Sequence, residues 1–272
     1  MDLYWIYDMP TWYLGLGFKV LFIGLSVVAL IATRGVIAKH LQLSHDLDQS
    51  VSAVFGAIGM IFGLFLGLIA VEAWENRNKL DDLISQEATS IIQLYRSVSV
   101  LKDPDHQDVL YEIRSYTQNL IEVAWPAYKR GESMDNGEAL MTMIHQKITA
   151  MESRSSAQAV AYEMAVSSFT DMARTRSLRI DSANLRIPTP FWYVIMGGSF
   201  MSIPILYFLK VPSLRLHIIF MVAYTFYLSG IVTLIAVLDN PMRGRLSASS
   251  QPFARALKAM TQIDAVKPPL RE

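Results

Sequence analysis

A long apolar segment at residues 51–74 constrains the fold of this chain more than any other feature, because it carries no charge before Glu72. Three further apolar segments lie at 12–33, 191–209 and 216–238. About 20 mostly apolar residues span a bilayer core about 30 Å thick. Unpaired backbone groups in hydrocarbon are costly, so each segment should be helical. The sequence therefore predicts an all-α, polytopic membrane protein with four transmembrane helices that packs against the lipid bilayer.

The long polar region between the second and third segments is predicted to be helical and to lie outside the membrane. Apolar residues spaced three and four apart run through residues 80–98, which continues the second segment as one helix. This organisation places the first two membrane helices at 1–74, the extramembrane helical stalk at 75–189, the last two membrane helices at 190–238 and a C-terminal tail at 239–272.

Helix starts and stops can be read from the stalk sequence. Asp103-Pro104 has the pattern of a capped helix start, and Asp135 stands three residues before Glu138, as in a capping box. Trp125-Pro126 should disturb the helix between these two points. Neither glycine nor proline occurs in 138–187, so we expect one long helix there, bent near 153–156.

Composition and motifs argue against an enzyme or a nucleic-acid-binding protein. The 24 basic and 24 acidic residues balance, so the charge favours no nucleic acid partner. The chain has no cysteine, which removes disulfides, thiolate metal sites and a cysteine nucleophile. We find no phosphate-binding glycine loop, no His-Glu-x-x-His and no Gly-x-Ser-x-Gly. We therefore predict no catalytic residue, no cofactor and no metal site.

Glycines mark one face of the second apolar segment. Small residues four apart let another helix approach closely, since lipid itself gives no hydrophobic drive for helix association. Simple helix packing is the expected role of this face, which consists of Gly56, Gly59, Gly63 and Gly67.

Bulky side chains form a second row on the same segment, turned away from the glycines. Such a row packs against lipid or a neighbouring helix, or, if several copies surround an axis, forms an apolar neck that gates by dewetting. Glu72 then becomes either an interfacial charge or one member of a carboxylate ring at the pore mouth, which favours cations. The candidate neck residues are Phe55, Ile58, Phe62, Phe65 and Ile69.

Basic residues near the span ends indicate the orientation. The side that holds the N-terminus, the stalk and the tail carries more of them than the opposite side, where Arg34, Lys39, Lys210 and Arg215 lie. Residues 1–11 contain no Lys or Arg, which argues the other way. We expect a multi-pass protein of the cell (inner) membrane with the stalk and both termini in the cytoplasm.

Three spaced sequence patches resemble the bestrophin-like family of membrane proteins. They occur in the order expected for that family and cover most of the chain from the second span onward. The first patch contains Trp74, Glu87, Tyr95 and Arg96, the second Trp125 and Pro126, and the third Asp239, Pro241, Gly244, Pro252 and Phe253.

The resemblance implies a homo-oligomeric ion channel. Bestrophins have four membrane helices, cytoplasmic helices and a five-fold ring in which the second span lines an apolar neck, so a pentamer with inorganic ions as its cargo is expected. No acidic cluster here matches the bestrophin calcium clasp. The alternative is a non-conducting membrane scaffold or sensor whose helical region binds a soluble partner, and the sequence leaves the ion unidentified.

Overall fold

The computed structural model describes residues 11–40, 45–101, 106–132, 137–151, 156–243 and 247–266. Within these ranges every regular element is a helix, which confirms the all-α prediction, and four helices are long and apolar enough to cross a membrane by length and composition. The elements are α2 (Thr11–His40), α3 (His45–Ser99), α4 (His106–Asn119), the π-helix η1 (Leu120–Ala124), α5 (Trp125–Arg130), α6 (Glu138–Ala150), α7 (Ser156–Asn184), α8 (Thr189–Ile205), the 3₁₀-helix η2 (Leu206–Phe208), α9 (Leu214–Leu238) and α10 (Gln251–Val266).

The chain divides into two compact units, which we describe separately. The membrane unit takes the described residues of Met1–Glu75 and Arg186–Asn240. The polar unit takes those of Asn76–Leu185 and Pro241–Arg243, together with α10. Helix α3 contributes its first part to the membrane unit and its second part to the polar unit.

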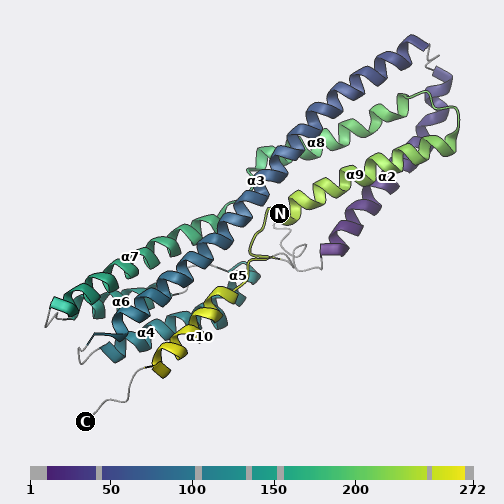
Figure 1. Cartoon of the computed structure of the whole chain (residues 1–272). Coiled ribbons are helices and arrows are strands. Elements are labelled where there is room, and N and C mark those ends of the chain that lie inside the picture. Colours follow the sequence, from purple (N-terminus) through teal and green to yellow (C-terminus); the bar gives the residue numbers. More distant parts are fainter. Residues whose placement is uncertain are drawn as a thin grey trace. The chain divides into compact units, whose positions relative to one another are not determined.

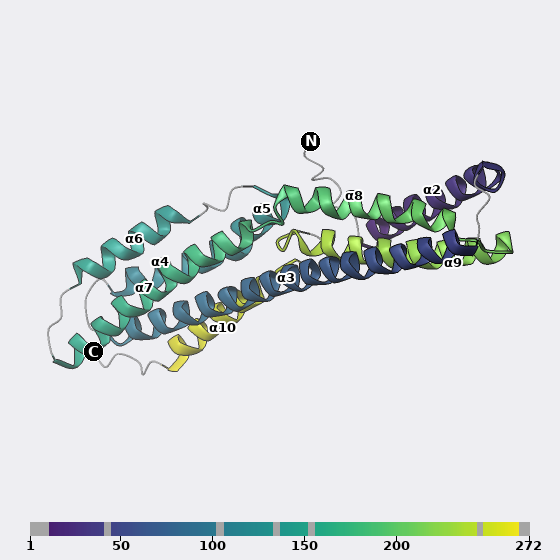
Figure 2. The same cartoon turned by 90° about the horizontal axis from the view of Figure 1, so that it is seen from above.

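In the membrane unit, α9 is the central packing element. It lies against both α2 and α8 (Figure 1, Figure 2). Its face of Met221, Leu228, Val232 and Ile235 is buried at helical spacing. Buried hydroxyls on α8 and α9, including Ser199, donate to carbonyls of their own helix, so these side chains leave no unmet donor in the apolar interior.

The polar unit is built around an extended apolar core to which α3, α4, α6, α7 and α10 all contribute. Helix α4 packs on α6 and on α10 (Figure 1). The amphipathic α10 docks through Phe253, Ala256 and Met260, which are fully buried at steps of three and four. The C-terminal segment is therefore part of this core.

The helix disturbance predicted at Trp125-Pro126 is a π-helical turn between α4 and α5. Helix α4 passes through the π-turn η1 before α5 begins at Trp125, because Pro126 has no backbone N–H to donate to the preceding turn. Helix α5 ends at Arg130, and its C-cap residue Gly131 has a φ of 81°, in the left-handed region that glycine adopts without strain. The buried Arg243 guanidinium covers Gly131 and donates a hydrogen bond to the carbonyl oxygen of Arg130.

Residues 138–187, predicted to form one long helix bent near 153–156, instead form two separate helices. Helix α6 ends at Ala150, where Met151 takes an extended conformation, and α7 begins at Ser156. The N-cap position of α6 is Gly137, and no side chain caps the helix there. The predicted caps Asp103, Pro104 and Asp135 lie outside the described residues.

Candidate functional site

In the membrane unit, the aromatic row of α3 lies largely against helices of the same subunit. The Phe55 ring meets Tyr224 of α9 edge-on at a centroid distance of 5.4 Å. Phe65 stacks on Phe191 of α8 at 6.2 Å and on Phe62 at 6.5 Å. Of the five predicted neck residues, Ile69 is buried, Phe55, Phe62 and Phe65 are half-buried, and Ile58 remains exposed.

Phe62 fits into space that Gly198 of α8 leaves open. A Cβ atom added to Gly198 would overlap the Phe62 ring, whereas one added to the adjacent Gly197 would meet no described atom within 4 Å. Gly198 therefore permits close contact between α3 and α8 within one subunit.

We expect Gly198→Ala to destabilise the protein by about 1–3 kcal/mol, the usual cost of overpacking a well-filled site. Thermal unfolding of the purified full chain in detergent measures this loss. Gly197→Ala is the matched control, because it adds the same methyl group one residue away into open space. Equal stability of the two variants would contradict the described fit between Phe62 and Gly198.

The described residues of the same subunit leave the opposite face of α3 uncovered. No described atom lies within 4 Å of a Cβ added to Gly56, Gly59, Gly63 or Gly67. Beside these glycines, Met60, Leu64 and Leu68 are 74%, 65% and 63% exposed, and the exposed Glu72 follows at the same four-residue spacing. The glycine face thus finds no packing partner in the described part of its own chain.

In the polar unit, a buried ion pair joins α3 to α7. The Arg179 Nε atom lies 2.5 Å from Glu87 Oε2, and the two side chains are 1% and 0% exposed. Tyr116 of α4 donates its hydroxyl proton to Glu87 Oε1 at 2.8 Å. Burial has the largest effect on the pKa of the Tyr116 hydroxyl, and the negative charge of Glu87 the next largest; both raise it well above its usual value. The phenol therefore stays protonated and acts as the hydrogen-bond donor.

Aromatic rings surround the Arg179 guanidinium. Its central carbon lies 5.7 Å from the Trp125 ring, 5.8 Å from Tyr128 and 6.0 Å from Phe253. Trp125 also packs edge-on against Phe253 at 5.5 Å and donates its indole N–H to the carbonyl oxygen of Ala248 at 3.0 Å. The cation is thus held by one carboxylate and several π faces away from water.

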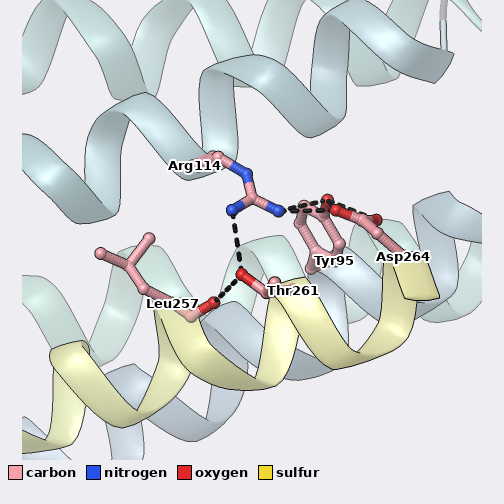
Figure 3. Close-up of polar contacts among 5 residues, drawn as sticks. All are labelled: Tyr95, Arg114, Leu257, Thr261 and Asp264. Carbon is pink, nitrogen blue, oxygen red and sulfur yellow. Dashed lines mark hydrogen bonds and ion pairs between the residues drawn. The ribbon is translucent and has the colours of Figure 1, made fainter.

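A second polar cluster in the same unit fixes α10 (Figure 3). The Tyr95 hydroxyl on α3 lies 2.8 and 2.9 Å from the two carboxylate oxygens of Asp264 on α10. Arg114 of α4 approaches the same carboxylate at 2.6 Å and the Tyr95 oxygen at 3.2 Å. Its other terminal nitrogen donates to Thr261 at 3.4 Å. Three helices therefore meet at one charged contact.

Four of the residues that suggested a family are buried in the polar unit, namely Glu87, Tyr95, Trp125 and Phe253. Each of them contacts other side chains or the backbone of this unit, which is a structural role. Their partners Arg179, Tyr116, Arg114 and Asp264 were not identified from the sequence. Glu87 and Arg179 are 92 positions apart, and no local motif could have connected them.

The other family-motif residues lie at helix ends or on the surface. In the membrane unit, Asp239 accepts a hydrogen bond from the backbone N–H of Ile187 at 2.6 Å. The Pro241 carbonyl accepts one from Ala248 in the polar unit. Trp74, Arg96 and Pro126 are exposed, Pro252 is half-buried near the start of α10, and Gly244 lies outside the described residues.

Across the described ranges, no three His, Asp or Glu side chains are grouped so as to hold a metal ion.

A search of curated proteins gives no match. The family profile described as the Bestrophin-like domain matches residues 20–253, which is most of the chain. The chain belongs to the bestrophin-like family.

Solved structures show the same fold at low sequence identity. A point variant of the bacterial bestrophin homologue from Klebsiella pneumoniae aligns with a TM-score of 0.70 and 12% identity, over 92% of this bestrophin-like chain and 98% of that chain. The same homologue, solved by Zn-SAD phasing, gives 0.70 and 11%, over 93% and 100%. A variant described as a membrane protein gives 0.71 and 12%, over 92% and 99%. At these identities, the likeness establishes the bestrophin fold.

Proposed function

We propose that this bestrophin-like chain assembles into a homo-oligomeric ion channel, with a pentamer favoured, in which α3 lies nearest the symmetry axis. The observation that carries the proposal is the uncovered face of α3 in the membrane unit. Leu64 and Leu68 are exposed on it, and Glu72 follows at the end of the apolar stretch. An apolar constriction with a carboxylate at its mouth is a recurring channel design.

Packing favours this uncovered face, and not the aromatic row, as the wall of the neck. The row of Phe55, Phe62, Phe65 and Ile69 is half-buried or buried by α8 and α9 of its own subunit. In this arrangement the aromatic side chains support α3 from behind. Met60, Leu64 and Leu68 border the passage, and the glycines beside them let copies of α3 pack closely.

We further propose that the channel lies in the cell (inner) membrane with the polar unit and both termini in the cytoplasm. The excess of basic residues near the membrane on that side supports this orientation. Inorganic ions are the proposed cargo.

Ion flux through liposomes that contain the purified protein tests the proposal. We expect wild-type flux above that of empty liposomes. Glu72→Gln should lower the cation-to-anion preference about fivefold, because a unit charge at close range in water contributes about 1 kcal/mol. The control is Glu163→Gln, which removes an exposed carboxylate from α7 in the polar unit. An assembled ring without flux would favour the non-conducting scaffold or sensor instead.

A further inference from the structure

The membrane unit contains an apolar groove of about 280 Å³ between α2 and the segment formed by α8 and η2. Leu21 and Leu25 of α2 and Phe200 of α8 line the groove and are exposed, so it opens onto the surface of the described chain. Both segments belong to the candidate membrane spans. In a bilayer this surface therefore meets hydrocarbon, where water is absent.

The two hydroxyl groups in the lining of the groove are already hydrogen-bonded. The Ser26 hydroxyl donates to the carbonyl oxygen of Ile23 at 3.0 Å, and the Tyr207 hydroxyl donates to the carbonyl oxygen of Ser26 at 3.3 Å. Both protons are thus used within the protein. An apolar cavity without polar groups to hold water suits an apolar ligand.

Three contacts between the two segments show the direction in which the groove runs. The Phe22 ring of α2 stacks on Phe200 of α8 at a centroid distance of 5.7 Å, and Tyr207 of η2 reaches Ser26 further along α2. Still further along, Arg34 of α2 donates a hydrogen bond to the carbonyl oxygen of Val211 at 3.2 Å.

The order of these contacts is the same on both segments, so the groove leads toward Arg34. The candidate span of α2 ends at Ile37, which puts Arg34 in the last turn of the span. Basic side chains at this depth lie near the lipid headgroups.

Arg34 is the second, independent observation that points to a ligand. Its side chain is half-buried and forms no ion pair within the ranges that the structure describes. The Nη1 atom is covered by the protein and has no hydrogen-bond partner there. The guanidinium therefore gains a bond when it turns toward a phosphate, because an unpaired buried donor costs free energy.

The neighbouring loop carries charge of the same sign. Residues 209–215 join η2 to α9 and include Lys210 and Arg215 but no acidic residue. Basic residues at a membrane surface attract anionic lipids. Charge complementarity thus favours a negatively charged headgroup at this end of the groove.

We propose that the groove is a binding site for an anionic phospholipid, with an acyl chain between α2 and α8 and the phosphate at Arg34. Arg34 follows the lining residue Ala29 by five positions on α2, or about 7.5 Å along the helix. This interval leaves room for the glycerol backbone between chain and phosphate. The site goes beyond the proposed channel and requires neither a ring nor ion flux.

Native mass spectrometry of the purified full-length protein in detergent tests the headgroup contact. The protein is titrated with phosphatidylglycerol and with phosphatidylcholine of the same acyl chains. We expect about fivefold tighter binding of phosphatidylglycerol, because one charge at close range in water contributes about that factor. Arg34→Gln should remove this preference, and Arg34→Lys should retain it.

A larger side chain in the groove tests the position of the acyl chain. Ala29→Leu should weaken the binding of both lipids roughly tenfold, the loss expected when about two methylene groups are no longer buried. Ala32→Leu is the matched control, because it makes the same enlargement at an exposed position of α2 outside the groove. It should bind both lipids as the wild type does.

Unchanged lipid binding in Ala29→Leu would overturn the proposal, as would an equal loss in Ala32→Leu. Retention of the phosphatidylglycerol preference in Arg34→Gln would also overturn it. Displacement of phosphatidylglycerol by millimolar inorganic phosphate would assign Arg34 to a free anion instead. A smaller assembly mass for Ala29→Leu, without a change in lipid binding, would assign the groove to a second copy of the chain.

Discussion

Arg179→Met is expected to lower the free energy of unfolding by about 3–5 kcal/mol, the usual cost of removing one partner of a buried ion pair. The substitution leaves the fully buried Glu87 carboxylate without its cation. It also removes the guanidinium that packs among Trp125, Tyr128 and Phe253. Chemical denaturation of the purified chain measures the loss.

The Glu87→Gln/Arg179→Met double variant separates charge from packing. The pair then carries no buried charge. The amide oxygen that Glu87→Gln introduces can still accept a hydrogen bond from the Tyr116 hydroxyl. We therefore expect the double variant to recover much of the stability that Arg179→Met loses. The control Arg130→Gln breaks the ion pair with Glu132, whose side chains are 61% and 54% exposed, and should change little. A fully stable Arg179→Met protein would contradict the assigned role of the pair.

A charged thiol reagent is expected to reduce flux through a Leu68→Cys channel roughly a hundredfold, since a charge in an apolar membrane environment costs about 2.5–3.5 kcal/mol. The native chain has no cysteine, so the reagent acts only at the introduced position. Leu68 is 63% exposed on the uncovered face of α3. Liposome flux before and after labelling gives the effect directly.

Phe62→Cys provides the comparison on the opposite face. Its side chain lies against Gly198 in the same subunit, so labelling should be slow and flux should persist. The reverse pattern, with block at Phe62→Cys and none at Leu68→Cys, would restore the aromatic row as the wall of the neck. The two variants therefore decide which face of α3 meets the ions.

Local sequence signals predicted several elements of the fold. The apolar period over 80–98 identified α3 as one helix that extends past the membrane segment, and α3 ends at Ser99. Trp125-Pro126 identified the disturbance after α4, because proline acts on its own preceding turn. Such features depend on residues that are close together in the sequence, so they can be predicted without knowledge of the tertiary packing.

Features that depend on tertiary packing were not predictable in the same way. Both faces of α3 in the membrane unit are apolar, so hydropathy could not tell which one α8 covers; the missing side chain of Gly198 makes room for Phe62. The weak stretch near 153–156 predicted a bend but not two separate helices, because no glycine or proline marks the division between α6 and α7.

Electron microscopy of the purified protein in a lipid bilayer tests the central claim most directly, because it gives both the subunit number and the position of α3. The proposal predicts a closed ring of identical subunits, with five favoured, and a central passage bordered by Leu64, Leu68 and Glu72. A monomer or dimer, or a ring whose α3 helices face lipid, would contradict it.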